Sequence, residues 1–365
     1  MMAQLRIPGP TPCPPEVLEA MSRQMIDHRG PEFVKIMQRV TDKLKQAFTT
    51  KNDLLVLTGS GTGGLEAAIV NTLSPGDKVL AVSIGVFGDR FAKIAQTFGV
   101  QVIPLNFEWG KAAEPEAIRE ALKKQPDTKA VMITHNETST GVTNDIGKIS
   151  PIVKGAGKLF IVDSISGIGS IKCPVDDWGI DVVISGSQKG WMVPPGLTML
   201  AVSADAWKAH AVAKIPHLYW DFTAAKKYLE KGQTPWTPAI SIIFALDVAL
   251  DILLKRGMDQ VIAHHNNVAN VARTGVKSIG LSLFAEESYA SDTVTSVTGP
   301  DGLDIKELRR ILREENKIVL GGGQQKLDGK IFRIGHMGYV SEKEIKEVVD
   351  AIRAALPRSG FKAAK

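Results

Sequence analysis

The stretch Leu159-Phe160-Ile161-Val162-Asp163-Ser164 decides the fold, because four apolar residues lead directly into an acidic one. A continuous apolar run of this kind is typical of a strand that is buried on both faces. Asp163 would then lie at the carboxyl end of the strand, where open α/β sheets bind their ligands. A buried carboxylate needs a cationic partner, and a protonated pyridine nitrogen would serve. The alternative is an aspartate that only caps the next turn.

Similar apolar runs surround this stretch and alternate with helical patterns between about residues 53 and 202. Strands are predicted at residues 54–58, 78–83, 100–104, 130–134, 159–162, 182–185 and 198–202. Helices are predicted at residues 65–73, 87–98, 115–124 and 146–156. Strands that alternate with helices indicate a three-layer α/β/α domain of the α/β class, built around a mostly parallel sheet.

The rest of the chain predicts a small C-terminal α+β domain. Long helices are expected at residues 239–255 and 260–279, strands at 293–297, 317–320 and 330–334, and further helices at 304–314 and 342–356. The pairs Asp304 with Glu307 and Ser341 with Glu344 have the spacing of capped helix starts. We therefore expect an N-terminal segment at residues 1–20, a large domain with a linking helix at 21–255, and a small domain at 256–365.

The composition indicates an ordinary intracellular protein that binds small molecules. Hydrophobic residues make up 44% of the 365 residues, and 44 Lys and Arg face 39 Asp and Glu, with no block of five like charges. This mild excess suits anionic small molecules and predicts no nucleic-acid partner. Two cysteines, Cys13 and Cys173, form no disulfide framework, and no run resembles a signal peptide or a membrane span. A cytoplasmic location is the expectation.

A glycine-rich turn, Thr58-Gly59-Ser60-Gly61-Thr62-Gly63-Gly64, lies between a predicted strand and a predicted helix. Glycines let the backbone approach an anion, and the helix start offers free N–H groups, so the turn predicts a phosphate cradle. A dinucleotide-binding turn is one alternative, but it needs an acidic residue at the end of the next strand, where Ser83-Ile84-Gly85 stands. A glycine-rich turn without a ligand is the other.

A lysine completes the set of strand-end groups. Val182-Val183-Ile184-Ser185-Gly186-Ser187-Gln188-Lys189 places it a few residues after a buried strand and 26 positions after Asp163, about one crossover unit. A partly desolvated lysine beside a cationic group has a lowered pKa and attacks carbonyls. A surface lysine in a loop is the alternative, but the order of cradle, aspartate and lysine on one sheet favours a site.

These segments together resemble a known family. Residues 59–66, 134–141, 162–164 and 185–189 are similar to the class V, fold-type-I aminotransferases that use pyridoxal 5'-phosphate (PLP), and most similar to the alanine/serine–glyoxylate aminotransferase family. The resemblance spans nearly the whole chain and includes residues 8–12, 28–33 and 332–335.

The resemblance implies a role for each site residue. Lys189 would hold PLP as a Schiff base and move the substrate's proton, and Asp163 would pair with the pyridine nitrogen. Arg333 would clamp the substrate carboxylate with its bidentate guanidinium, while Gly9 and Pro10 would line the substrate pocket. The other implied cofactor contacts are Ser60, Gly61, Thr62 and Gln188 at the phosphate, Phe87 at the ring, Thr138 at the ring hydroxyl, Thr237 reaching the phosphate from a partner subunit, and Ile165. No metal is implied.

The chain also departs from the pattern of the best-known relatives. Phe87 stands where they have Trp as the stacking residue, Thr62 where they have His, and Thr234 where some have Tyr. These departures put the transfer of substrate preference in doubt but leave the cofactor unchanged. Outside the motifs, His264 and His265 are expected on a solvated helix face, and His336 is expected to be a packing histidine.

The resemblance therefore implies a homodimeric transaminase with shared active sites. Alanine or serine would donate an amino group, and glyoxylate or pyruvate would accept it, in a ping-pong reaction. A lyase or a cysteine desulfurase on the same scaffold is the first alternative, although neither cysteine occupies the late loop position that desulfurases use. A nucleotide-dependent oxidoreductase and an inactive binding subunit are the others.

Overall fold

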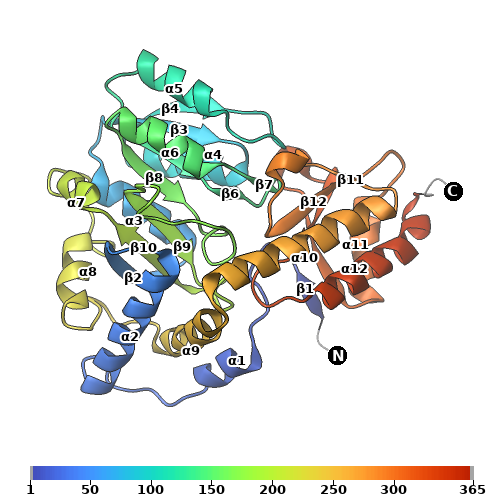
Figure 1. Cartoon of the computed structure of the whole chain (residues 1–365), viewed down its shortest axis with the longest axis horizontal. Coiled ribbons are helices and arrows are strands. Elements are labelled where there is room, and N and C mark those ends of the chain that lie inside the picture. The colour runs from blue at the N-terminus through green and yellow to red at the C-terminus, as the bar shows by residue number, and fades with distance from the viewer. Residues whose placement is uncertain (1–2, 362–365) are drawn as a thin grey trace.

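Two β-sheets organise the chain, and the computed structural model describes residues 3–361 (Figure 1). The larger sheet has seven strands, in the spatial order β2, β10, β9, β8, β5, β3 and β4. Their bounds are β2 (Asp53–Gly59), β3 (Lys78–Ser83), β4 (Gln101–Asn106), β5 (Ala130–Thr134), β8 (Leu159–Asp163), β9 (Val182–Gly186) and β10 (Gly196–Val202). Of these seven, β10 alone runs opposite in direction to the other six. Each predicted strand forms within two residues of its expected bounds.

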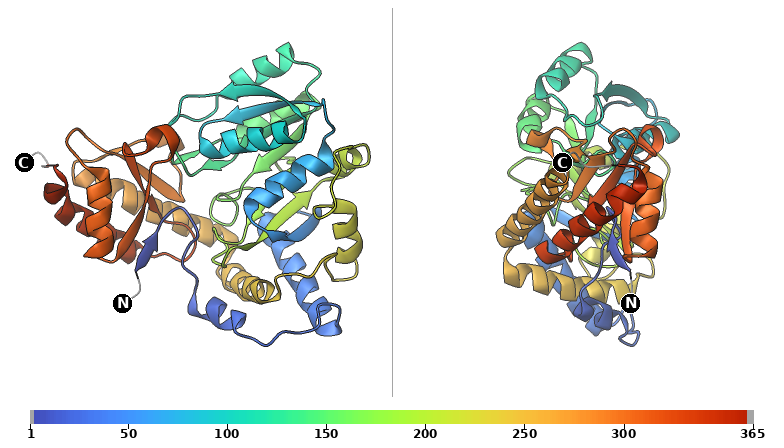
Figure 2. Two further views of the ribbon diagram at one scale, coloured as in Figure 1. Left: turned by 180° about the vertical axis from the view of Figure 1, so that it is seen from behind. Right: turned by 90° about the vertical axis from the view of Figure 1, so that its right-hand side faces the viewer.

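Helices cover both faces of this sheet because successive side chains of a strand point to opposite faces and enter two separate hydrophobic cores. On β2, Leu54 and Val56 belong to one core, and Leu55 and Leu57 belong to the other. One face is covered by α1 (Pro15–Met21), α2 (Pro31–Phe48), α5 (Pro115–Lys124), α6 (Ile146–Gly155) and α9 (Ile240–Arg256). The other is covered by α3 (Gly61–Thr72), α4 (Val86–Thr97), α7 (Ala204–His210) and α8 (Phe222–Leu229). The predicted three-layer α/β/α architecture is confirmed (Figure 2).

The second sheet has five strands in the order β1, β13, β14, β12 and β11. Their bounds are β1 (Gln4–Arg6), β11 (Ser282–Leu283), β12 (Val294–Thr298), β13 (Ile318–Gly322) and β14 (Ile331–Gly335). Its core is shared with α10 (Met258–Ser278), α11 (Ile305–Glu314) and α12 (Glu342–Ala355). Both predicted helix caps form, on Asp304 and on Ser341. The chain passes from α9 to α10 at Gly257, so a domain division near residue 256 falls between two helices and stays a prediction.

Several elements were not predicted. No element was predicted before residue 53, where α1, α2 and β1 form, and α7 and α8 were not predicted either. β1 pairs in parallel with β13, which lies more than 300 residues away, so no local sequence pattern predicts this pairing. A short hairpin of β6 (Asn136–Glu137) and β7 (Val142–Thr143) and the 3-10 helices η1 (Glu287–Tyr289), η2 (Gln325–Leu327) and η3 (Leu356–Ser359) complete the described chain. Within it, no helix has the length and apolar character needed to cross a bilayer.

Candidate active site

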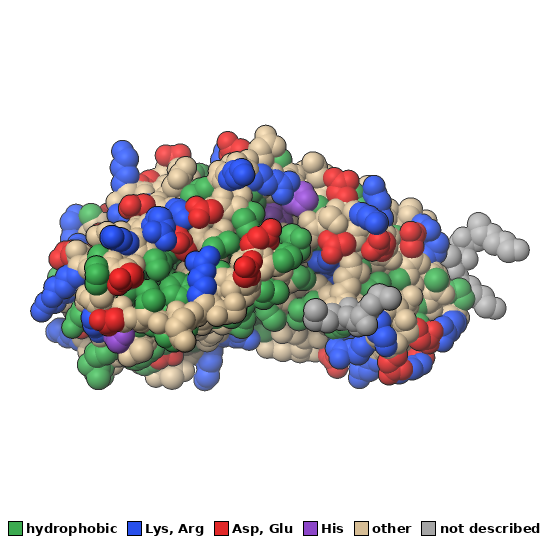
Figure 3. Space-filling view, turned by 90° about the horizontal axis from the view of Figure 1, so that it is seen from below, with side chains coloured by type: hydrophobic (Ala, Val, Ile, Leu, Met, Phe, Trp, Pro, Cys, Tyr) green, Lys and Arg blue, Asp and Glu red, His purple; other side chains and the backbone are tan. Residues whose placement is uncertain are grey.

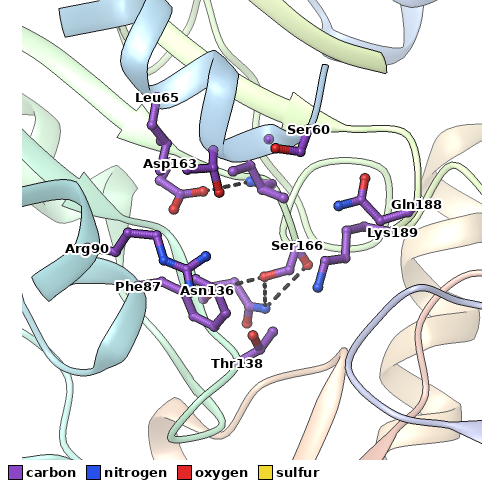
Figure 4. Close-up of a pocket in the computed structure, with 13 residues that line it drawn as sticks. Ser60, Leu65, Phe87, Arg90, Asn136, Thr138, Asp163, Ser166, Gln188 and Lys189 are labelled. Carbon is purple, nitrogen blue, oxygen red and sulfur yellow. Dashed lines mark hydrogen bonds between the residues drawn. The ribbon is translucent and has the colours of Figure 1, made fainter. Parts of the chain in front are cut away.

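A cavity opens at the carboxyl ends of the parallel strands, where Asp163 ends β8 and the glycine-rich turn follows β2 (Figure 4). About 530 Å³ of empty space lies within it, part of it open to solvent. Its lining residues are Ser60, Gly61, Thr62, Leu65, Phe87, Arg90, Asn136, Thr138, Asp163, Ile165, Ser166, Gln188 and Lys189. The structure thus brings together nine of the predicted site residues: Ser60, Gly61, Thr62, Phe87, Thr138, Asp163, Ile165, Gln188 and Lys189.

The N-terminus of α3 forms one wall of the cavity. α3 begins at Gly61, four residues earlier than predicted, and its N-cap residue Ser60 makes no side-chain cap hydrogen bond. The first amides of a helix have no intrahelical acceptor, so this end attracts anions. Gly61 is required here because a Cβ would lie 2.5 Å from Cδ1 of Ile165. The wall is therefore suited to a phosphate group.

Gln188 and Lys189 follow β9 on a loop that is held in place by hydrogen bonds within the loop itself. The Ser187 hydroxyl donates to the Pro194 carbonyl at 2.7 Å and accepts the Leu197 N–H at 3.2 Å, which closes the loop. Oε1 of Gln188 is buried without a hydrogen-bond partner among the described residues. Because an amide can rotate by 180°, this side chain can present its NH₂ group to an anion at the α3 wall. A phosphate bound there would accept a hydrogen bond from this NH₂ group.

Lys189 places its amine in the cavity. The pKa of Lys189 is lowered to about 8, mainly by burial and in smaller part by the charges of Arg333 and Arg90, while the Asp163 carboxylate opposes the shift. More of the amine is therefore neutral near neutral pH than for an exposed lysine, which makes it a better nucleophile toward carbonyls. Lys189 is the one lysine among the residues that line the cavity.

Asp163 lies across the cavity from Lys189, and one carboxylate oxygen accepts the Ile165 N–H at 3.0 Å (Figure 4). Burial raises the pKa of Asp163 to about 7, and the Glu137 carboxylate adds to the rise, while the Ile165 N–H, Lys189 and Arg90 oppose it. Burial thus disfavours the charged form of this carboxyl. A cation bound beside it would favour the charged form, so the position suits the protonated nitrogen of a pyridine ring.

Glu137 fixes the helix that bears Phe87, and the sequence analysis gave it no role. Its carboxylate accepts the N–H groups of Phe87 at 3.0 Å and Gly88 at 3.1 Å, and both the N–H and hydroxyl of Ser139. Because its side chain is fully buried, the pKa of Glu137 is raised despite these four donors. Gly85 at the start of α4 is required, since a Cβ there would lie 2.5 Å from Cγ of Glu137. Glu137 therefore positions the Phe87 ring at the cavity.

Asn136, Ser166 and Arg90 also line the cavity and were missed. Nδ2 of Asn136 donates to the hydroxyls of Ser166 and Thr293, both at 2.8 Å, and so joins the cavity to the segment before β12. Arg90 lies with its guanidinium carbon 4.8 Å from the centre of the Phe87 ring. Asn136 stands in the quoted motif at residues 134–141, but its partners are set by the tertiary fold.

Four predicted residues lie outside the thirteen that line the cavity. Arg333, on β14, is buried and donates to the Thr138 carbonyl and the Gly322 carbonyl, both at 2.8 Å. Burial lowers the pKa of Arg333 to about 10. Gly9 packs directly against Lys189. Pro10 and Thr237 are exposed in this chain, so their roles at the substrate and at a partner's phosphate stay predictions.

Two histidine expectations have different outcomes. The expectation of a solvated face is wrong for His265, whose side chain is buried because the loop after β14 packs onto α10. His265 Nδ1 bonds the Val261 carbonyl at 2.7 Å, and Nε2 accepts the Gly338 N–H at 3.0 Å. His336 is confirmed as a packing histidine; it is fully buried and bonds the Thr295 hydroxyl at 2.8 Å.

The buried histidines make stability depend on pH. Burial lowers the pKa of His135 and His265 to about 4, and that of His336 to about 3. An unfolded chain protonates histidine near pH 6.5, so from about pH 6.5 to 4 the unfolded state binds protons that the folded state does not. This stability is present above pH 6.5 and lost as the pH falls, by about 1.4 kcal/mol per pH unit for each histidine. The raised pKa values of Asp163 and Glu137 act in the opposite direction.

Replacing His265 isolates one of these contributions. In His265→Gln, we expect the slope of unfolding free energy against pH between about pH 6 and 5 to decrease by about 1.4 kcal/mol per unit. Urea unfolding at several pH values measures this slope. His264→Gln on the same helix is the matched control. An unchanged slope in His265→Gln would contradict the assignment.

Comparison with known proteins places this site in a family. The model described as "Aminotransferase class-V" matches residues 5–350. An uncharacterized aminotransferase of Methanocaldococcus jannaschii is 44% identical over 361 residues, covering 98% of this chain and 93% of the relative. A soluble hydrogenase 42 kDa subunit of Anabaena cylindrica is 42% identical over 98% of this chain and 94% of its own length. A serine–glyoxylate aminotransferase of Methylorubrum extorquens is 36% identical over 98% and 92%.

The solved structures agree with this placement. The crystal structure of an alanine–glyoxylate aminotransferase from Nostoc sp. superposes with a TM-score of 0.94 at 30% identity, covering 98% of this chain and 96% of that one. The fold of this group is that of PLP-dependent enzymes, and the α3 wall, Asp163 and Lys189 form a donor set that suits PLP. This chain belongs to the class V aminotransferase family.

Proposed function

We propose that this protein is a PLP-dependent aminotransferase that moves an amino group from alanine or serine to glyoxylate or pyruvate. One observation supports this most strongly: the Lys189 amine, the Asp163 carboxylate and the uncapped N-terminus of α3 all face one cavity. Bound there, PLP would supply an electron sink for negative charge on the substrate α-carbon.

Each part of the site then has a task. The α3 amides, Ser60, Thr62 and Gln188 would hold the phosphate, Phe87 and Ile165 would enclose the ring, and Thr138 with Asn136 would face its hydroxyl side. Asp163 would keep the ring nitrogen protonated, because a buried carboxylate gains most from a cationic neighbour. Lys189 would anchor the cofactor covalently. The free, neutral amine of Lys189 would take the proton from the substrate α-carbon.

The choice of substrates is supported by similarity and by charge. Relatives carry the names serine–glyoxylate and pyridoxamine–pyruvate aminotransferase, and a solved relative that of alanine–glyoxylate aminotransferase. Every such pair includes a small carboxylic acid. Arg333 reaches the carbonyl of the cavity residue Thr138 through Nη1, and no described residue bonds its Nη2, which leaves that group for a substrate carboxylate. Gly9 and Pro10 would lie beside the substrate.

We also propose a homodimer with shared active sites. Thr237 is exposed on the segment before α9, where it can reach a second subunit. Large hydrophobic side chains are exposed nearby in sequence, including Leu218, Tyr219 and Trp236. Figure 3 shows hydrophobic side chains gathered on the half of the lower face that α1, α2 and α9 occupy, with charges of both signs around them. Such a surface favours association with a second protein surface.

The spectrum of the purified protein tests the proposed function. With PLP added, we expect a yellow protein with an absorption band at roughly 400–430 nm, the range of a lysine-bound cofactor. L-Serine or L-alanine should bleach the band, and glyoxylate or pyruvate should restore it without release of ammonia. Initial rates should give the parallel double-reciprocal lines of a ping-pong reaction. A protein that takes up no PLP would overturn the proposal.

The same experiment separates the alternatives. A lyase or desulfurase would release ammonia or alanine without needing a 2-oxo acid. Neither Cys13 nor Cys173 lines the cavity, and burial raises the pKa of Cys173 to about 12, which disfavours a reactive thiol. One relative carries the name of a hydrogenase subunit. A subunit without aminotransferase activity would show no bleaching. The presence of Lys189, Asp163 and Arg333 supports activity instead.

Arg333→Lys tests the carboxylate contact. The change keeps a positive charge, but an ammonium cannot bond the two carbonyls and also place an N–H where Nη2 lies, so we expect KM for both substrates to rise about 30-fold, as for the loss of a charge-assisted hydrogen bond of about 2 kcal/mol. The cofactor band should remain. Arg309→Lys is the matched control, because Arg309 also bonds a carbonyl of the second sheet, Leu320 at 3.2 Å. Loss of the cofactor band in Arg333→Lys would contradict the substrate role.

A further inference from the structure

Residues 6–11, called here the N-terminal strap, connect the second sheet to the catalytic loop. At one end, β1 pairs with β13, and the buried Arg6 forms an ion pair with Glu344 in the capping box of α12. Arg6 is only 2% exposed, so this end is firmly fixed. The chain then crosses from the second sheet to the loop that follows β9.

At its other end the strap forms hydrogen bonds to the main chain of two cavity residues. The Thr11 N–H donates to the Gln188 carbonyl at 3.1 Å, and the Thr11 hydroxyl donates to the Lys189 carbonyl at 3.1 Å. Gly338 closes over this contact, since a Cβ there would lie 2.9 Å from the Thr11 hydroxyl oxygen. Thr11 is buried, and both of its hydrogen bonds act on the backbone that bears the amine.

Between these ends the strap touches the amine itself. Nζ of Lys189 donates to the Pro8 carbonyl. Gly9 has φ of +119°, and a Cβ there would lie 2.6 Å from Nζ and 2.8 Å from Cε, so only glycine allows this approach. A carbonyl accepts an N–H and offers none, so this contact restricts how the amine rotates about its last bond.

We propose that the N-terminal strap sets the position of the Lys189 amine, with Thr11 as a positioning residue and the Pro8 carbonyl as the acceptor of the free amine. Its catalytic consequence rests on the proposed function, because the rate of a lysine-dependent reaction depends on how the amine is aimed. The contacts themselves do not require it. Thr11→Val keeps the side-chain shape and removes the hydroxyl, whereas Thr11→Ser keeps the hydroxyl.

The first measurement uses the cofactor-free protein. Reductive methylation with formaldehyde and a borohydride reagent, read by mass spectrometry at Lys189 over a range of pH, reports the reactivity of its amine. In Thr11→Val we expect the rate at neutral pH to increase about fivefold, the effect of one hydrogen bond, because the Lys189 backbone loses its bond to the strap and the amine is held less firmly against the Pro8 carbonyl. Thr11→Ser should stay within twofold of the parent.

The second measurement uses the holoenzyme. In Thr11→Val we expect kcat to fall about fivefold with KM for the amino donor within twofold, and Thr11→Ser to restore kcat. Thr41→Val is the matched control, because the Thr41 hydroxyl is buried on α2 with no hydrogen-bond partner among the described residues. It should change neither quantity.

The outcomes separate the strap from the proposed function. A methylation rate in Thr11→Val equal to that of the parent would overturn the proposed role of the strap. Equal losses of kcat in Thr11→Val and Thr11→Ser would also overturn it. If the protein takes up no PLP, the proposed function fails, but the methylation profile still reports whether Thr11 controls the amine. If Thr11→Val fails to fold, Glu344→Gln weakens the other end of the strap by removing the charge that pairs with Arg6, and methylation of Lys189 is expected to increase in the same direction.

Discussion

Lys189→Ala is expected to lower the rate of transamination by about 10⁴-fold or more, because one change removes both the proposed covalent anchor and the proposed base. Among residues 3–361, no other lysine lines the cavity, so no described neighbour can take its place. The cofactor should no longer absorb as a lysine-bound species and should separate from the protein on gel filtration. Steady-state rates and absorption spectra measure both effects.

A small amine makes this test sharper. The alanine leaves space where the lysine side chain lay against Gly9, so added methylamine should restore part of the rate in Lys189→Ala and not in the parent. Lys172→Ala is the matched control, since Lys172 is exposed and lies outside the cavity. A rate in Lys189→Ala within tenfold of the parent would show that another group does the chemistry.

Asp163→Asn is expected to lower kcat/KM by about a thousandfold. The asparagine can still accept the Ile165 N–H, so the geometry is kept and only the charge is lost. A charge pair about 4 Å apart at an effective dielectric of about 20 is worth about 4 kcal/mol, which corresponds to about a thousandfold in rate.

The same variant has a signature in the cofactor-free protein. The Asp163 carboxylate raises the pKa of Lys189, so its removal should move that pKa below its value of about 8. The pH profile of Lys189 methylation measures the shift. Asp181→Asn is the matched control: Asp181 is also buried and pairs with Lys154 at 2.7 Å, but it lies outside the cavity. A parent-like rate in Asp163→Asn would show that the ring nitrogen needs no anionic partner.

Much of the fold could be predicted because its elements have local signals. The strand before Asp163 is a run of apolar residues, and its neighbours in the larger sheet repeat the same pattern. The composition of each of these strands therefore predicts that both of its faces are buried. The site followed from the same logic, since parallel strands end at one edge and bring Asp163 and Lys189 there. Helices near the N-terminus were missed, although the apolar residues of α2 recur at helical spacing.

His265 shows the limit of such patterns. A histidine among asparagines on α10 has the surroundings of a surface residue, and only the packing of the loop after β14 buries it. Glu137 is a similar case, because its four donors come from α4 and from its own hairpin, and no spacing in the sequence indicates that set.

The sequence alone determined the class of fold and the three groups that face the cavity, because hydrophobic periodicity and strand ends are local properties of the chain. Only the tertiary structure decided what holds those groups in place. β1 pairs with β13, Thr11 bonds Lys189 across 178 residues, and Asn136 bonds Thr293 across 157. Such contacts form where distant backbones meet, and a polar residue bears no local mark of the partner that will satisfy it.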